Sequence, residues 1–180
     1  MSFTQSIRTC FRKYVTFSGR ASRPEYWFFF LFVFLGGMIA TALDMAVFPD
    51  SVEVNEEVSD TEVAFEVNAT GPIQTVFSLG TFLPLLAAGW RRMHDSGRSG
   101  LHLVYPLMVM IGTATFAAFG MGIAEGVGGA GEGVATVTAI ILMIALAVLL
   151  ISPLLVLWWL ARPTQEGANR YGPQPHMVEA

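Results

Sequence analysis

Residues 134–160 read VATVTAIILMIALAVLLISPLLVLWWL and contain no charged side chain. A helix rises about 1.5 Å per residue, so about 20 apolar residues cross the hydrocarbon core of a bilayer, which is about 30 Å thick. Within this stretch, AIILMIALAVLLI (139–151) shows none of the apolar–polar alternation that the strands of a membrane barrel require. Backbone polar groups in hydrocarbon must be bonded within their own element. The stretch therefore predicts a transmembrane helix.

Three further apolar stretches precede this one, and they cover residues 27–48, 73–90 and 101–123. The whole chain of 180 residues is 53% hydrophobic and 13% charged, whereas soluble domains carry about 25% charged residues. Such a composition leaves too much apolar surface for water. The sequence therefore predicts an all-α membrane protein, a four-span transmembrane helical bundle.

The ten Lys and Arg residues all lie outside the four stretches and, if the stretches cross in turn, on one side of the membrane. Cytoplasmic loops collect Lys and Arg, so this side is expected to be cytoplasmic, with both termini there. The predicted organisation is a cytoplasmic segment (1–26), an acidic outer loop (49–72), a basic inner loop (91–100) and a cytoplasmic tail (161–180).

The amino-terminal segment is a candidate amphipathic helix over residues 2–15. Its apolar face consists of Phe3, Ile7, Cys10, Phe11 and Tyr14. Its other faces carry the basic residues Arg8, Arg12 and Lys13. This pattern is typical of a helix that lies in the membrane interface. Packing against the inner ends of the bundle is an equally good interpretation.

Three segments rich in Arg, Gly and polar residues are expected on the inner side: FSGRASRPEYW (17–27), WRRMHDSGRSG (90–100) and RPTQEGANRYGP (162–173). Their order and their patterns, GRxSRxEYW, RRxHDxGRSG and NRYGP, resemble the YhaH/YhaI-like family of uncharacterised bacterial inner-membrane proteins, domain of unknown function 805. The resemblance covers nearly the whole chain except the acidic outer loop. It implies a small multi-span protein of the bacterial inner (plasma) membrane, and it implies no particular activity.

Two interpretations of these segments remain open. In the first, Arg–carboxylate pairs form a polar clasp that ties the inner ends of the spans together, with clasp residues Glu25, His94, Asp95 and Asn169. In the second, the surplus of Arg binds an anion, and phosphate-bearing lipid headgroups are the nearest candidates. The residues expected in that anion or headgroup site are Arg20, Arg23, Arg91, Arg92, Arg98 and Arg170.

Other chemistry has little support in the sequence. His94 and Asp95 share a short loop with two serines, but no nucleophile elbow surrounds them. No metal-ligand spacing, cofactor motif or nucleic-acid module is present. We therefore expect a structural or interaction protein, not an enzyme. Its expected partners are anionic membrane lipids or a protein that the sequence cannot identify, and stripes of small residues allow a homo-oligomer.

The alternative function is a small transporter or channel subunit, whose path would run past Asp44 and Pro84. Asp44 is the only Asp, Glu, Lys or Arg within a predicted span, and interfacial exposure is its simplest explanation. Pro84 deprives the carbonyl of Gly80 of its helical hydrogen bond. The acidic outer loop is expected to be disordered, and loose binding of divalent cations is the other possibility.

Overall fold

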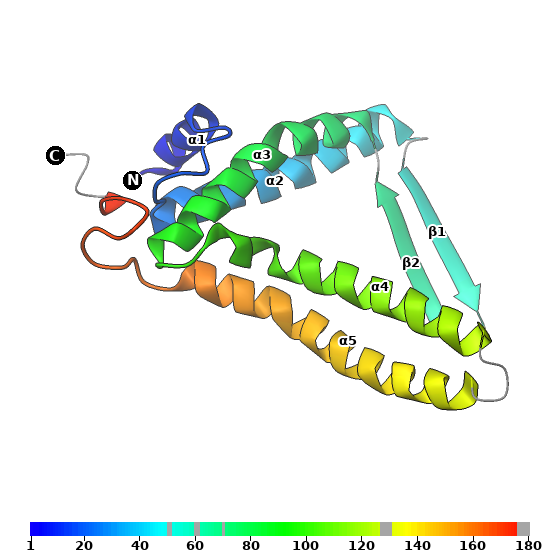
Figure 1. The fold of residues 1–180 in the computed structure, drawn as a ribbon. Coiled ribbons are helices and arrows are strands. Elements are labelled where there is room, and N and C mark those ends of the chain that lie inside the picture. Colours follow the sequence, from blue (N-terminus) through cyan, green and yellow to red (C-terminus); the bar gives the residue numbers. More distant parts are fainter. Residues whose placement is uncertain (50–51, 60–61, 70, 127–130, 176–180) are drawn as a thin grey trace.

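The computed structural model consists mainly of four long helices arranged as two hairpins (Figure 1). It describes residues 1–49, 52–59, 62–69, 71–126 and 131–175. The elements in chain order are α1 (Phe3–Arg12), α2 (Arg23–Val47), β1 (Val52–Ser59), β2 (Glu62–Ala69), α3 (Pro72–Asp95), the 3₁₀ helix η2 (Gly100–Val104), α4 (Tyr105–Gly126) and α5 (Gly131–Ala161).

One hairpin pairs α2 with α3, and the other pairs α4 with α5. The two hairpins approach each other at one end and diverge toward the other, as Figure 1 shows. At the end where they meet, α3 contacts η2 and α5, and α1 lies against α2 and α3. We call this end, formed by α1 and by residues 13–26, 90–104 and 158–175, the basic end.

The side chains that face outward from the hairpins are apolar. Leu79, Phe119 and Met143 are each at least 70% exposed, whereas Arg91 and Arg92 are no more than 1% exposed. A soluble protein shows the opposite distribution. Each of α2, α3 and α5, together with the segment Gly100–Ile123, is long and apolar enough to cross a membrane. The chain is therefore an integral membrane protein with four helical spans, as the sequence predicted.

Helices α2 and α3 are capped at their amino-terminal ends in different ways. The hydroxyl of Ser22 accepts a hydrogen bond from the amide of Glu25, and Pro24 occupies the first turn of α2. The N-cap position of α3 is Gly71, which has no side chain that could cap the helix. Asp44 of α2 takes this role.

The Asp44 carboxylate accepts hydrogen bonds from the amides of Ile73 (3.0 Å) and Gln74 (2.7 Å). A carboxylate at this position also complements the positive end of the α3 dipole. A Cβ at Gly71 would collide with the Asp44 side chain, so only glycine fits there. Asp44 is 1% exposed, and the expectation that it is exposed at the interface is wrong because the start of α3 covers it.

Helix α1 packs against α2, as one of the two interpretations of the amino-terminal segment required. The ring of Phe11 meets that of Phe29 edge-on at a centroid distance of 5.5 Å. Cys10, which precedes Phe11 in α1, is fully buried. The hydroxyl of Ser6 donates to the carbonyl of Pro24. Contact of the exposed face of α1 with lipid stays a prediction.

The acidic connection between α2 and α3 contains a β-hairpin, so the prediction of a disordered loop is wrong for residues 52–59 and 62–69. Strands β1 and β2 pair antiparallel, with Val54 opposite Val67 and Val58 opposite Val63. These valines are the signal that the sequence offered, because β-branched residues favour strands. The acidic side chains of this connection, on which the predicted loose binding of divalent cations depends, lie outside what the structure describes.

The proline within α3 has a partner in α1. Pro84 has no amide hydrogen, so the carbonyl of Gly80 lacks its usual helical donor. The hydroxyl of Tyr14 donates to this carbonyl at 2.8 Å. The amino-terminal segment therefore satisfies a backbone group that would otherwise face hydrocarbon without a partner.

We predict that Tyr14→Phe lowers the free energy of unfolding by about 1–3 kcal/mol, the range for an acceptor left without a donor away from water. In a Pro84→Ala background the same substitution should have little effect, because residue 84 can then donate to Gly80. SDS titration of the four proteins in mild detergent measures this coupling.

Tyr105→Phe serves as the control, since no hydrogen bond of its hydroxyl is found within the described part of the chain. Equal losses from Tyr14→Phe in both backgrounds would contradict the assignment.

Candidate functional site

Five charged side chains are buried together at the basic end, and we call them the charge cluster. They are Arg20, Glu25, Arg91, Arg92 and Asp95, and none is more than 6% exposed. The segment before α2 supplies Arg20, the first turn of α2 supplies Glu25, and the last turns of α3 supply the other three. Spacings of three and four residues place Asp95 on the same side of α3 as the two arginines.

Asp95 is the centre of the cluster. Its Oδ1 lies 3.0 Å from Nε of Arg20, and its Oδ2 pairs with Nη1 of Arg92. The hydroxyl of Thr164 also donates to Oδ2, at 2.7 Å. Both oxygens are thus occupied, and one carboxylate ties together the segment before α2, the end of α3 and the segment after α5.

The second pair joins α2 to α3. Nη1 of Arg91 donates to Oε1 of Glu25. Nε and Nη2 of Arg91 are buried and have no hydrogen-bond partner among the described residues. The Cys10 thiol of α1 lies close to this pair, and burial, together with the Glu25 charge, raises its pKa to about 12. The thiol is therefore protonated at neutral pH.

Arginine side chains also satisfy carbonyls at and beyond the end of α5. Nε of Arg92 donates to the carbonyl of Leu160 (2.9 Å), and Nε of Arg23 donates to that of Arg162 (2.9 Å). Arg20 donates to the carbonyls of Gln165 and Gly167. The last carbonyls of a helix lack internal donors and carry partial negative charge. The arginines of the first hairpin therefore hold the second hairpin.

The tail after α5 folds back over the end of α3. The side-chain amide of Asn169 donates to the carbonyl of His94 at 2.9 Å, and the ring of Tyr171 stacks on the His94 ring at 3.7 Å. Nδ1 of His94 lies 3.0 Å from the carbonyl of Gly19. Gly19 and Gly97 form the tight turns, with φ of +83° and +77°, where L side chains are strained. Of the four residues assigned to a clasp, His94, Asp95 and Asn169 thus lie together, whereas Glu25 pairs with Arg91.

The six arginines assigned to an anion site divide into two groups. Arg20, Arg91 and Arg92 are buried in ion pairs and face other protein groups. The other three, Arg23, Arg98 and Arg170, are exposed or half-buried. The guanidinium of Arg98 lies 5.5 Å from the Trp159 ring centroid, and that of Arg170 lies 4.7 Å from the Tyr171 ring. An anion contacting all six at once does not fit this geometry.

Sequence reasoning missed Thr164, Gln165 and the carbonyls after α5 as members of the site. A backbone acceptor leaves no trace in the residue type, so only the polar character of the 162–173 segment could have suggested it. Within the described residues, no three His, Cys, Asp or Glu side chains gather as metal ligands would.

We predict that Asp95→Asn lowers the free energy of unfolding by about 3–5 kcal/mol, because removing one partner leaves buried charge uncompensated. Glu166→Gln removes an acid of the same tail that is exposed and makes no ion pair with a described residue. It should change the stability by less than about 0.5 kcal/mol. SDS titration compares both with the wild type, and equal effects would contradict the central role of Asp95.

Comparison with known proteins places the chain in a family. The inner membrane protein YhaI of Escherichia coli K12 is 34% identical over 89 residues, which are 49% of this chain and 59% of YhaI. The inner membrane protein YhaH of the same organism is 30% identical over 105 residues, which are 56% of this chain and 71% of YhaH. The matched part of this chain thus spans less than two thirds of YhaI. No solved structure matches the chain significantly.

The family described as "Protein of unknown function (DUF805)" matches residues 14–173. This range contains all four spans, the charge cluster and the tail that covers it. The chain therefore belongs to the DUF805 family.

Proposed function

We propose that the chain is a bacterial inner-membrane protein with its basic end and both termini in the cytoplasm, where the basic end binds anionic lipid headgroups. It would serve as a structural or interaction component of the membrane. The positive-inside distribution of Lys and Arg supports the orientation. The names of YhaI and YhaH as inner membrane proteins support the location.

The observation that carries the proposal is the unbalanced charge at the basic end. All ion pairs of the described residues lie within the charge cluster. The cations that form none with a described residue are Arg8, Arg12, Lys13, Arg23, Arg98, Arg162 and Arg170. The remaining acid among the described residues of this end is Glu166, which is exposed. The free cations therefore outnumber the free carboxylates.

Several of these cations lie beside tryptophans. The guanidinium of Arg162 is 4.7 Å from the Trp158 ring, and that of Arg98 is over Trp159. Tryptophan rings favour the headgroup level of a bilayer, so stacking fixes these two cations at that level. Each Lys or Arg near an anionic leaflet contributes on the order of 1 kcal/mol to the attraction.

Asp44 and Pro84, the two residues that suggested a transporter, both have structural explanations. Asp44 caps α3, and the carbonyl freed by Pro84 is bonded to Tyr14. No other specific observation favours it. A protein partner with acidic groups would use the same exposed cations as a lipid, and the test below separates the two.

We predict that the wild type, purified in nanodiscs of mixed phosphatidylglycerol and phosphatidylcholine, retains phosphatidylglycerol in excess of its bulk fraction. Replacing Arg98, Arg162 and Arg170 together by Gln should reduce this excess, and raising the salt should do the same because screening weakens exposed charges. Native mass spectrometry of the released protein–lipid complexes measures the excess.

Glu166→Gln serves as the control, and unfolding midpoints verify that all variants are folded. No excess of phosphatidylglycerol in the wild type would reject lipid binding and leave an acidic protein partner as the occupant of the basic end.

A further inference from the structure

We infer that a cavity of about 370 Å³ at the basic end is a binding site for one phosphate group, carried by a lipid headgroup or free in solution. The inference deepens the proposed function, on which it rests, since it names a discrete site within the basic end. Its volume is in the range of ligand pockets in proteins, about 300–1,000 Å³.

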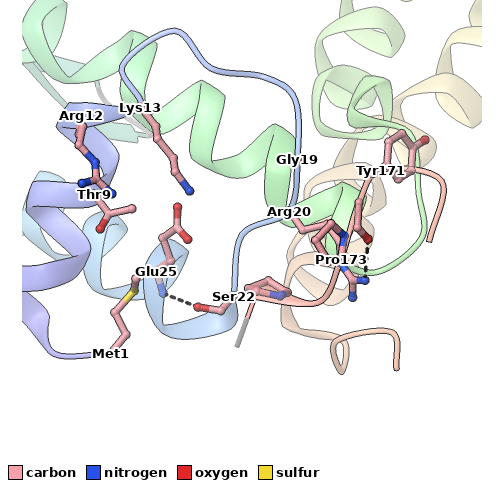
Figure 2. Close-up of a pocket in the computed structure, with 12 residues that line it drawn as sticks. Met1, Thr9, Arg12, Lys13, Gly19, Arg20, Ser22, Glu25, Tyr171 and Pro173 are labelled. Carbon is pink, nitrogen blue, oxygen red and sulfur yellow. Dashed lines mark hydrogen bonds between the residues drawn. The ribbon is translucent and has the colours of Figure 1, made fainter. Parts of the chain in front are cut away.

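The cavity lies between α1 and the carboxyl-terminal tail (Figure 2). Arg12 and Lys13, at the end of α1, border it on one side, and Arg20 and Tyr171 border it on the other. Glu25 forms part of its wall, and Figure 2 shows the Lys13 amino group directed toward the Glu25 carboxylate. Two cations at the end of α1 and the paired Arg20 from the segment before α2 thus border one space.

The charge around the cavity is positive even after every described ion pair is counted. Arg12 is exposed and Lys13 is half-buried, and neither forms an ion pair with a described residue. Glu25 is the only acid among the described residues of the wall, and Arg91 pairs with it. Arg12 and Lys13 are therefore available to bind a ligand, whereas the Glu25 carboxylate already pairs with Arg91.

The groups behind the wall add to this charge. The members of the charge cluster that do not line the cavity are Arg91, Arg92 and Asp95, and their net charge is positive. Arg91 is 1% exposed, yet its Nε and Nη2 have no hydrogen-bond partner in the described part of the chain. A buried cation that pairs with Glu25 of the wall and retains unsatisfied donors adds to the attraction for an anion.

Phosphate matches these groups better than other small ligands. Its several oxygens accept hydrogen bonds from guanidinium and ammonium groups at once. A metal ion or an amine would face three cations and find no free carboxylate. The hydroxyl of Thr9, which also borders the cavity, can donate to a further phosphate oxygen.

The test compares Arg12→Gln/Lys13→Gln with Arg8→Gln in the full chain in neutral detergent. Arg8 is an exposed cation of the same helix that does not line the cavity, so the control removes charge from α1 without touching the site. The probes are dihexanoyl phosphatidylglycerol and inorganic phosphate, titrated separately and followed by native mass spectrometry.

We expect a single adduct on the wild type and on Arg8→Gln. The double variant should bind at least about tenfold more weakly, which corresponds to about 1.4 kcal/mol. Lys13→Arg should keep most of the affinity because it keeps the charge. Binding of the lipid alone assigns the phosphate to a headgroup, and binding of both probes assigns the site to the phosphate group itself.

The inference is overturned if the wild type takes up neither probe, or if Arg8→Gln weakens binding as much as the double variant does. These failures differ from failure of the proposed function. Loss of the single adduct with retained phosphatidylglycerol excess in nanodiscs rejects the cavity alone. Absence of that excess with a retained phosphate adduct rejects the lipid-binding face and keeps the cavity.

Discussion

The pairing of Arg20 and Arg92 with one buried carboxylate, Asp95, is the interaction on which the arrangement of the four spans depends. Removing charges from water is expensive, and a buried ion pair offsets this only where geometry and further hydrogen bonds are good. Asp95 meets the condition because both oxygens are occupied and Thr164 adds a third donor. The arginines meet it by donating further hydrogens to carbonyls at and beyond the end of α5. Arg91, with its unsatisfied donors, departs from this pattern.

The membrane explains why a polar cluster holds the hairpins together. In hydrocarbon, helices gain little by hiding apolar side chains from a solvent that is equally apolar. The side chains of α4 and α5 accordingly stay exposed over most of their length, and the hairpins diverge away from the basic end (Figure 1). Polar groups, in contrast, have no good alternative partner in lipid. The basic end is therefore where the two hairpins are joined, and the tail containing Asn169 and Tyr171 closes over that junction.

The four spans could be predicted from the sequence, because long apolar segments cross a bilayer. The Arg, Asp and Glu residues of the three motifs also predicted a charged junction. Four features could not be predicted in this way. The cap of α3 by Asp44 joins positions 29 residues apart, and the bond from Tyr14 to Gly80 joins positions 66 apart, so neither is visible in a local pattern. The division of the arginines into paired and exposed groups depends on burial. Strands β1 and β2 were missed because acidic residues obscured the alternating valines.

The most direct test of this account is the coupling free energy between Arg20 and Asp95, one of the two pairings on which the junction depends. It is measured by SDS titration of Arg20→Met, Asp95→Asn and the double variant. Each single substitution should lower the free energy of unfolding by about 3–5 kcal/mol, because it removes one partner of a buried ion pair. The double variant should lose less than the sum, since neither charge of the pair remains. If the two effects add to within about 0.5 kcal/mol, the pair does not act as a unit and the account is contradicted.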